Sequence, residues 1–544
     1  MRNCLLIFIL TYLLTGIFNK SYSQILAIDS ITFDKDYFPG FNDINGKYLG
    51  STETMSIVNH NGKLFAGMGN WMDYPITTES EGTQILRKDS HDSPWVVDTT
   101  IGFSSLRCDG FQEVIFTKDY NGDDLSSPVN MLVGGFTRTI PPYNTSIWVR
   151  KNDINKWYRN IVNVYSATPG LTGIRSFNIH TDKITGKQWI FCGTASGVIF
   201  KAAYDPTKEG LLEIDITPEI NNLGRIMAMT VCNNDLYISA GVDVINNDTI
   251  GGIYRRIDGV NPSWELVYRW AHDPSINQGQ NVMRGLTCIP DPLGSNNDVI
   301  IGARNMGGLI QIIQPFNNDN IYTELDVTQY FADLWFDGNW PYMDYAIIAY
   351  NDFTPDTINE QKYWWISLAI YAPNQLTSPD NGAYFLLRNE EGMYRWGYIY
   401  DDENPVPNGK SLRATRTICK SPFSEESNNT YYFGGYDCLA DTSNNTAWIY
   451  KGTLHNLTMG TSDFQSQMNQ ILIYPNPLNN FVTVKNIPKG STVQIFDVTG
   501  KILYQSNDIY SHSLTINTDK YRQGVYLIKV QNSKNTITKK MIVN

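Results

Sequence analysis

The feature that most constrains the fold of this sequence is a strand pattern that recurs along most of its 544 residues. Two apolar, strand-like stretches are followed by a hairpin, which is clearest in "GGIYRRIDGVNPSW" from Gly251 to Trp264. Related hairpins begin at Gly82, Thr145 and Gly382. The first strand of the hairpin recurs seven times, with starts near residues 84, 147, 198, 253, 310, 384 and 448. Repeats at intervals of 51 to 74 residues predict a series of four-stranded sheets.

A four-stranded sheet cannot bury both of its faces alone, so successive sheets are expected to pack face to face in a ring. We therefore predict an all-β fold, with a seven-bladed β-propeller over residues 24–455 and no convincing helix between its strands. The ring has to close, and the last repeat offers only "TLHNLTM" after its third strand. We expect "DSITFDKDYF", Asp29 to Phe38, to pair into that repeat. The alternative is an independent N-terminal strand.

Residues 1–23 have the pattern of a secretory signal peptide. Arg2 precedes an apolar run from Leu5 to Phe18, and Ser21 and Ser23 provide a small-residue cleavage site. An uncleaved membrane anchor is the alternative, although the run is short for a helix that needs about 20 apolar residues to span. We find no later apolar run of that length, so we predict no transmembrane segment in the mature chain.

The last 75 residues, 470–544, carry the most specific motifs of the chain. In order, these are Tyr474-Pro475-Asn476-Pro477, Phe481 to Val484, Val493 to Lys501, Gly524 to Tyr526 and Lys539 to Val543. The segment resembles the type A C-terminal sorting domain of the Bacteroidetes type IX secretion system. The resemblance implies that the secretion machinery is a partner and that the protein is secreted or anchored at the outer-membrane surface. Alternating apolar residues predict a small Ig-like β-sandwich, which could instead be adhesive without a sorting role. The polar stretch 456–469 is the predicted linker.

Two of the recurring hairpins also resemble degenerate Asp-box turns of sialidase-like propellers. Asp258 and Asp153 match the aspartate of that motif, and Trp264 and Trp157 match the aromatic residue. The resemblance implies a structural role, in which the aspartate accepts hydrogen bonds from its own turn and the tryptophan packs between strands. We therefore do not expect the function to lie at these hairpins.

The charge of the chain is unevenly distributed. Residues 470–544 hold nine Lys and Arg against three Asp and Glu, whereas the preceding mature chain holds 31 basic against 51 acidic residues. An acidic main body argues against nucleic acid as a partner, because the phosphate backbone is bound mainly by Lys and Arg.

We predict no cofactor and no metal site. The six histidines are scattered, and neither a phosphate-binding glycine loop nor a nucleophile elbow is found. "DYNGDD", Asp119 to Asp124, resembles the start of a calcium loop but lacks the acid at its twelfth position, which favours a plain turn. Most mature cysteines fall in apolar strands, where buried thiols are expected, and a Cys419–Cys438 bridge stays open.

The arginines at the starts of the first strands are one group of candidate binding residues. Strand direction places these starts on the same face of the ring as the loops between second and third strands, opposite the recurring hairpins. The five arginines are Arg107, Arg175, Arg225, Arg284 and Arg413. A ring of guanidinium groups binds carboxylates or other anions through forked hydrogen bonds. The alternative is structural, with each arginine paired to a carboxylate or carbonyl of a neighbouring blade.

The loops on that face supply a second group of candidates. They combine aromatic side chains with polar ones, at Trp71, Asp73, Tyr74, Arg138, His272, Asp273, Trp335, Asp337 and Trp340. Aromatic rings beside polar groups suit sugars, whose apolar faces stack and whose hydroxyls need polar partners. The alternative is that many of these aromatics fill gaps between blades.

Three functions fit these patterns, and the fold alone does not choose among them. The sequence favours a binding module for glycans or surface proteins. A glycan-active hydrolase or lyase is the second hypothesis, although no catalytic residue is recognisable because paired carboxylates would come from separate blades. A structural protein of the envelope is the third.

Overall fold

A computed structural model gives the fold of the chain. It describes residues 26–28, 31–70, 82–138, 141, 143–165, 172–221, 223–241, 250–271, 282–292, 294–304, 308–315, 321–336, 345–348, 353–371, 382–399, 412, 414–437, 445–455, 471–474, 480–485, 487, 491–509, 513–531 and 536–543. The chain divides into two compact units. The larger covers residues 27–457 apart from 292–294, and the smaller includes residues 458–544. The domain boundaries that the sequence suggests, including the signal peptide and the linker, stay predictions.

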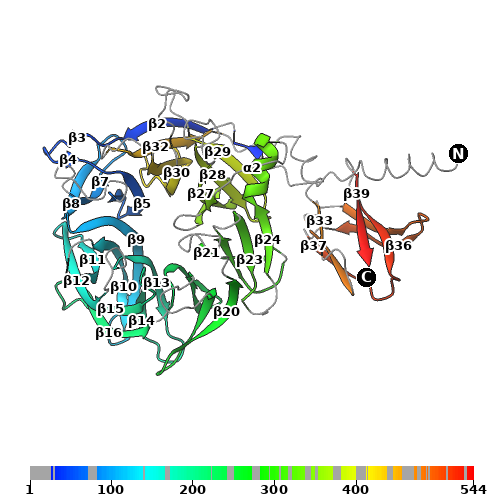
Figure 1. Cartoon of the computed structure of the whole chain (residues 1–544), viewed down its shortest axis with the longest axis horizontal. Coiled ribbons are helices and arrows are strands. Elements are labelled where there is room, and N and C mark those ends of the chain that lie inside the picture. Colours follow the sequence, from blue (N-terminus) through cyan, green and yellow to red (C-terminus); the bar gives the residue numbers. More distant parts are fainter. Residues whose placement is uncertain are drawn as a thin grey trace. The chain divides into compact units, whose positions relative to one another are not determined.

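The larger unit consists of antiparallel sheets that follow one another in a ring (Figure 1). Three sheets are separate and four-stranded. They are β13(Ile174–Thr181) to β16(Leu212–Ile220), β17(Ile226–Cys232) to β20(Ser263–Ala271), and β21(Met283–Ile289) to β24(Ile321–Asp326). Their middle strands are β14(Gln188–Thr194), β15(Ile199–Tyr204), β18(Asp235–Ala240), β19(Ile250–Ile257), β22(Val299–Arg304) and β23(Leu309–Ile313). Each sheet keeps the order of the chain, as the repeat predicts.

Two larger sheets complete the ring. One joins β5(Glu53–His60), β6(Lys63–Gly69), β7(Thr83–Lys88) and β8(Val96–Gly102) to β9(Ser105–Lys118), β10(Asp124–Arg138), β11(Asn144–Lys151) and β12(Lys156–Tyr165). The other joins β25(Tyr345–Ile348), β26(Thr354–Ile358), β27(Gln361–Tyr371), β28(Gly382–Asn389) and β29(Tyr394–Tyr398) to β30(Ala414–Lys420), β31(Thr430–Tyr436) and β32(Ala447–Leu454). The predicted all-β class is confirmed, and the count of seven blades stays a prediction.

The ring closes where the N-terminal strand meets the last strands. β2(Ile31–Tyr37) pairs antiparallel with β32, with Ile31 opposite Leu454 and Phe33 opposite Gly452. The predicted pairing of this segment into the last repeat is therefore confirmed. Because the two strands come from opposite ends of the unit, closure depends on a contact of the longest sequence separation, which carries a large entropic cost.

The strands of the ring follow one another in groups of four, such as β5 to β8, and the second strand of each group is buried on both faces. In β6 and β31 almost every residue is buried, because each strand lies in the middle of a sheet that is covered by a sheet on either side. Gly193 of β14 shows how closely the sheets approach, since a Cβ atom there would lie 2.4 Å from a side-chain atom of Ile226 in the next sheet. Glycine in the second strands is thus required by packing between sheets.

Buried ion pairs join consecutive groups of four strands at the C-terminal ends of the third strands. Each pair links a cation of a third strand to a carboxylate on the fourth strand of the preceding group. The pairs are Lys88 with Asp36, Arg150 with Asp98, Arg256 with Glu219, and Arg388 with Glu324, at N–O distances of 3.1, 3.0, 2.9 and 2.7 Å. All four cationic side chains are at most 4% exposed. We call them the interface pairs; their recurrence marks them as part of the framework.

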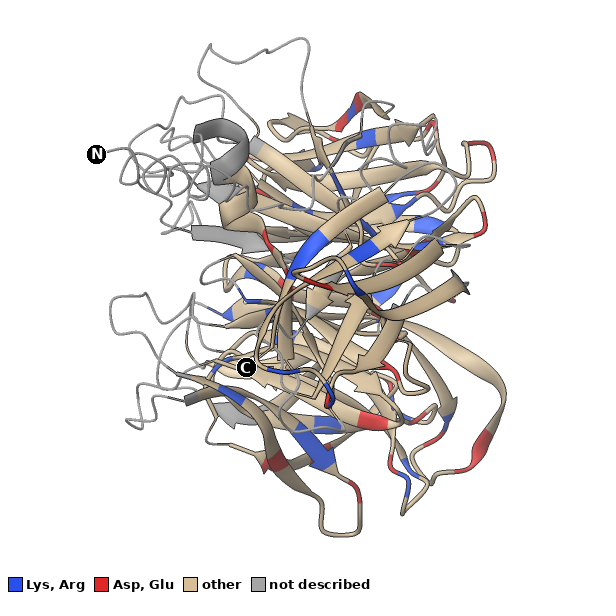
Figure 2. Ribbon diagram, turned by 90° about the vertical axis from the view of Figure 1, so that its right-hand side faces the viewer, with Lys and Arg blue, Asp and Glu red and all other residues tan. Residues whose placement is uncertain are grey.

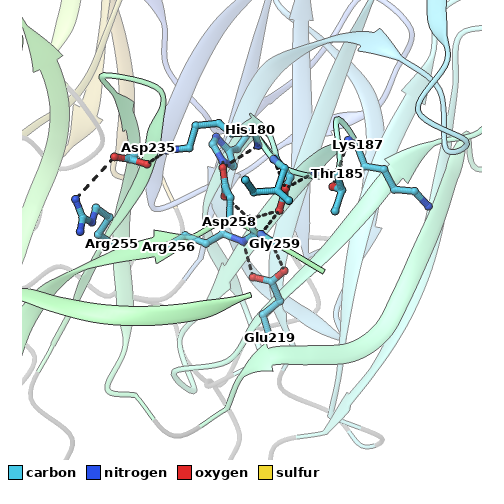
Figure 3. Close-up of polar contacts among 12 residues, drawn as sticks. His180, Thr185, Lys187, Glu219, Asp235, Arg255, Arg256, Asp258 and Gly259 are labelled. Atoms are coloured by element: carbon cyan, nitrogen blue, oxygen red, sulfur yellow. Dashed lines mark hydrogen bonds and ion pairs between the residues drawn. The ribbon is translucent and has the colours of Figure 1, made fainter. Parts of the chain in front are cut away.

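The pair at Arg256 extends into a larger cluster around the hairpin that begins at Asp258 (Figure 3). Arg256 donates to Glu219 through Nε and Nη2, both at 2.9 Å, and through Nη1 to Asp182 at 2.8 Å and to Asp258. Asp258 also accepts the backbone N–H of Lys183 at 2.9 Å. The resemblance to Asp-box turns was wrong on this point, since it implied that Asp258 accepts hydrogen bonds from N–H groups of its own turn. In the described residues Asp258 accepts them instead from Arg256 and from Lys183, which follows β13 of the preceding sheet.

A helix interrupts the ring of strands. α2(Val327–Phe336) follows β24, whereas the sequence predicted no convincing helix in this region. Asp326 caps it, because its Oδ1 accepts the backbone N–H of Gln329 at 2.9 Å. The helix contacts β23 and β25 and so fills the space between two sheets.

The smaller unit has two sheets around one core. A three-stranded sheet contains β33(Leu472–Tyr474), β34(Phe481–Lys485) and β37(Ser513–Asn517). A four-stranded sheet contains β36(Ile502–Ile509), β35(Ser491–Asp497), β38(Gly524–Gln531) and β39(Thr536–Val543). Val482 and Val484 from the first sheet pack in one cluster with Ile495 and Ile528 from the second. The alternation of buried and exposed residues along β38 is that of a sheet with one face against a core.

The described residues give no sign of a metal site or of a disulfide. No three His, Cys, Asp or Glu side chains lie close enough there to hold a metal ion. Asp119 of the calcium-like loop accepts the N–H groups of Asn121, Gly122 and Asp123, which makes it a turn. Cys419 is a free, buried thiol, and Cys438 lies outside the described residues. No helix within the same residues is long and apolar enough to cross a membrane.

Candidate functional site

A pocket lies where the first strands of the groups meet at the centre of the ring. Within the described residues, β5, β9, β13, β17 and β21 contact one another in that order, and β30 contacts β5. The strands β5, β9 and β13 face the centre of the ring in Figure 1. The pocket has a volume of about 50 Å³. It is lined by Met55, Ser56, Asp109, Gly110, Phe111, Gln112, Arg175, Ser176, Phe177, Met227, Met229, Arg284 and Arg416. We call it the axial pocket.

A β-bulge in each of these inner strands supplies much of the lining. The ladder between β13 and β14 skips Arg175, because Ile174 pairs with Thr194 and Ser176 with Gly193. The same irregularity leaves out one residue of β5, β9, β17 and β30, namely Met55, Asp109, Met227 and Arg416. All five left-out residues line the pocket. A bulge interrupts the alternation of a strand and re-aims a side chain, so the repeated bulge is what turns these residues to the centre.

Asp109 is the carboxylate at the heart of the site. Its side chain is fully buried and its Oδ1 lies 2.7 Å from Nε of Arg107 and 3.3 Å from Nη2 of Arg175. The hydroxyl of Thr137 donates to its other oxygen. Gly173 permits this approach, because a Cβ atom there would lie 2.2 Å from Oδ2 of Asp109. Burial by itself would raise the pKa of Asp109, but Arg107 and Arg175 together lower it below its ordinary value.

The arginines outnumber the carboxylates around this pocket. Burial lowers the pKa of Arg175 well below its usual range, and the guanidinium groups of Arg107, Arg225 and Arg284 lower it further against the opposing effect of Asp109. Burial also lowers the pKa of Arg225, again helped by Arg107. In the described part of the chain, Arg225 forms no ion pair with a carboxylate. Several like charges are therefore held together in a site of restricted solvent access.

A second carboxylate, that of Glu53, belongs to the neighbouring strand β5. Arg416 donates through Nη1 to Glu53, and its Nη1 lies 2.9 Å from Sδ of Met55. The Arg416 side chain is 9% exposed and that of Glu53 is fully buried. This pair adds no net charge, so the excess comes from the side of β9, β13, β17 and β21.

The overall charge distribution does not single out this site. Figure 2 shows Lys and Arg interspersed with Asp and Glu over the strands and turns. Contacts distinguish it, because Arg107, Arg175 and Arg225 lie close enough to affect one another, and Arg107 and Arg175 share the carboxylate of Asp109. A fixed excess of guanidinium groups with few carboxylates is an arrangement that an anion stabilises.

Of the sequence candidates, Arg175 and Arg284 line the axial pocket, and Arg107 and Arg225 lie near them. Arg107, Arg175, Arg225 and Arg284 interact electrostatically with one another, and Arg138 lies one strand further out at the end of β10. The remaining candidates lie outside the described residues or have side chains that are not described there: Trp71, Asp73, Tyr74, His272, Asp273, Trp335, Asp337, Trp340 and Arg413. Asp109 and Arg416 were missed. Asp109 follows Arg107 by two residues in "LRCDG", and Arg416 follows Arg413 by three residues in "LRATR".

Residues 472–544 match the family described as "Secretion system C-terminal sorting domain". This segment is a sorting domain. The protein is therefore an export substrate of the type IX secretion system and reaches the cell surface or the surrounding medium. The sorting domain implies an interaction with that secretion machinery, as the motifs from Tyr474 to Val543 predicted.

Several solved structures match most of the chain at low identity and low TM-score. PorZ of Porphyromonas gingivalis, a surface component of its type IX secretion system, has 15% identity and a TM-score of 0.39; the match covers 91% of this chain and 59% of PorZ. A structural genomics protein of unknown function from Bacteroides thetaiotaomicron has 9% identity, a TM-score of 0.32 and coverages of 78% and 75%. Sqt1 of Saccharomyces cerevisiae has 10% identity, a TM-score of 0.36 and coverages of 95% and 100%. No curated protein matches the chain.

Proposed function

We propose that this exported protein is a binding protein whose axial pocket holds an anionic group of a glycan or of a surface protein. The observation that carries the proposal is the excess of arginines over carboxylates around the pocket. Guanidinium groups bind carboxylate and sulfate through paired hydrogen bonds, and they do so best where water is scarce. An anion would offset the mutual repulsion of Arg107, Arg175 and Arg225.

The size of the pocket limits what enters it. A volume of about 50 Å³ exceeds the roughly 10–15 Å³ that a cavity needs to hold one water molecule, but it is far below the roughly 300–1,000 Å³ of sites that enclose whole ligands. The pocket therefore suits one anionic group of a larger ligand. The aromatic loops predicted from the sequence, around Trp71, His272 and Trp340, are the proposed contacts for the rest of that ligand.

The state of Asp109 favours binding over glycan hydrolysis. A glycosidase needs one carboxyl group that is protonated near neutral pH, and burial commonly raises the pKa of such a group. Arg107 and Arg175 instead lower the pKa of Asp109, which keeps it ionised. Its hydrogen bonds from Thr137 and Arg107 and its ion pair with Arg175 also occupy the oxygens that would have to reach a substrate.

Calorimetric titration of the full mature protein tests the proposal. Sulfate and glucuronate are the probes, and glucose is the neutral counterpart of glucuronate. We expect both anions to bind and glucose not to bind. Arg225→Gln should weaken anion binding about tenfold, the effect of losing one charge-assisted interaction. Arg255→Gln is the matched control, because Arg255 is 31% exposed and pairs with Glu265 away from the pocket. Equal affinity for glucose and glucuronate, or no binding of either anion, would contradict the proposal.

The export role is tested by a separate experiment. Removal of residues 470–544 should leave the protein in the periplasm, because the sorting domain at 472–544 is lost. A fusion of residues 470–544 to an unrelated periplasmic protein is the matching gain-of-function control. Surface display of the truncated chain would show that another segment directs export.

A further inference from the structure

A second pair of arginines lies beyond the axial pocket on the same group of strands. Arg138 is the last residue of β10, and Arg159 lies on β12. The Arg159 side chain extends to the end of β11, where Nη2 donates to Oδ1 of Asn144 at 2.6 Å and Nε donates to Oγ of Ser146 at 3.2 Å. Both acceptors are neutral, so they hold the guanidinium in place without balancing its charge.

The two arginines lie close enough to repel each other. Burial lowers the pKa of Arg159, and the positive charge of Arg138 lowers it further. Burial also lowers the pKa of Arg138. The Nε atom of Arg138 is buried and has no hydrogen-bond partner within the described residues, and neither arginine forms an ion pair with a carboxylate there. The flanking stretches 139–143 and 166–171 contain no Asp or Glu.

The pair is connected to the axial pocket through the ladder of β9 and β10. Thr137, the neighbour of Arg138, pairs with Arg107, and its hydroxyl donates to Asp109. Adjacent strands are about 4.8 Å apart, so the path from β9 to β12 spans roughly 10–15 Å. One ligand that reaches both places must carry at least two anionic groups at about that separation.

We propose that Arg138 and Arg159 form a second anion subsite for the ligand of the axial pocket, and that this ligand is an acidic polysaccharide. The inference rests on the proposed function of the axial pocket. The strands along the path favour a glycan over an acidic peptide. β10, which carries Arg138, is paired with β9 on one side and with β11 on the other, so it offers no free backbone edge to which a peptide strand could add. At Arg138, recognition therefore depends on the side chain, and a guanidinium group suits carboxylates repeated along a sugar chain.

Titration of the full mature protein with galacturonate oligomers of one to six residues tests this inference. We expect the longer oligomers to bind at least tenfold more tightly than the monomer, because they reach the second subsite. The double substitution Arg138→Gln and Arg159→Gln should remove this gain and leave the affinity for the monomer unchanged. Arg225→Gln should weaken both monomer and oligomer. The thermal melting temperature of each variant shows that it is folded, and Arg159→Lys, which keeps a cation, should retain part of the gain.

The possible failures are distinguishable. Monomer binding without a gain in longer oligomers, or a gain that survives the double substitution, would overturn the second subsite and leave the axial site standing. A hexaglutamate peptide that binds more tightly than the hexamer of galacturonate, in a manner that depends on Arg138 and Arg159, would overturn the choice of a glycan. Absence of any binding by galacturonate, glucuronate and sulfate would refute the axial site, and with it the second subsite.

Discussion

Arg256 and Arg175 are both almost fully buried arginines within the same ring of sheets, yet their surroundings are opposite. Arg256 is surrounded by Glu219, Asp182 and Asp258, and these carboxylates raise its pKa although burial alone would lower it. Arg175 shares the single carboxylate of Asp109 with Arg107 and is repelled by other arginines, so its pKa is lowered. Three carboxylates surround the single guanidinium group of Arg256 and form with it the saturated cluster, whereas Arg175 has one carboxylate and several neighbouring guanidinium groups.

The number of carboxylates around a buried arginine distinguishes the residues that hold the ring together from those that we propose bind a ligand. The interface pair at Arg256 recurs at Lys88, Arg150 and Arg388, each time between consecutive groups of four strands, as expected of contacts that build the ring. The excess of cations around Arg175 occurs at the one place where the inner strands converge. A buried arginine is therefore informative only together with the number of carboxylates that face it.

The largest expected effect comes from removing the central cation of the saturated cluster. Arg256→Met should lower the free energy of unfolding by about 3–5 kcal/mol, because Glu219, Asp182 and Asp258 then stay buried without their shared partner. Urea unfolding followed by circular dichroism measures it. Arg255→Met, at the exposed neighbouring residue, should cost less than about 1 kcal/mol. Equal losses for the two variants would show that the cluster contributes no more than a surface pair.

Removal of the carboxylate from the cationic site should have a smaller effect that an added anion reverses. Asp109→Asn should cost about 3 kcal/mol, because Arg107 and Arg175 lose their charged acceptor. Sulfate should raise the melting temperature of this variant more than that of the wild type, since it can occupy the place of the carboxylate. The same comparison with Asp182→Asn serves as the control. A sulfate response that is identical in all three proteins would contradict the distinction between the two sites.

Acid should weaken the saturated cluster in a predictable direction. Arg256 and the N–H groups of Thr185 and Gly259 lower the pKa of Asp182, although burial opposes them. A carboxyl whose pKa is lower in the folded than in the unfolded chain stabilises the fold above the unfolded value of about 3.9, and this stability is lost as the pH falls through the folded pKa. Asp182→Asn should be roughly 2 kcal/mol less stable than the wild type at pH 7, with the gap closing towards pH 2. A gap that does not depend on pH would mean that charge is not the cause.

The smallest effect on stability is expected where a cation has no carboxylate partner in the described residues. Arg225→Gln should change the free energy of unfolding by less than about 1 kcal/mol, because lost packing is balanced by relief of repulsion from Arg107. The same variant is expected to lose anion affinity, so stability and binding separate. A loss above about 3 kcal/mol would place Arg225 with Arg256 among the framework residues.

The sequence predicted the position of the cationic cluster but not its composition. Arg107, Arg175, Arg225 and Arg284 were found because each begins an inner strand, and equivalent positions in a repeat lie at the same end of the ring. Asp109 and Arg416 were missed because the sequence reasoning considered only the arginine at the start of each inner strand and could not foresee the bulges. The bulges in β9 and β30 shift the alternation of each strand by one residue and turn both side chains inwards.

The sequence by itself determined the features that depend on local pattern. These are the all-β class, the closing strand at Ile31–Tyr37 and the sorting domain at 472–544. Strand alternation, turn residues and sequence motifs each depend on residues that are consecutive in the chain. The tertiary structure decided which charges are balanced. Arg256 and Arg175 look alike in sequence. Only packing brings Asp182 and Glu219 to Arg256, beside its neighbour Asp258, and three arginines to Arg175, because these partners come from other strands of the ring.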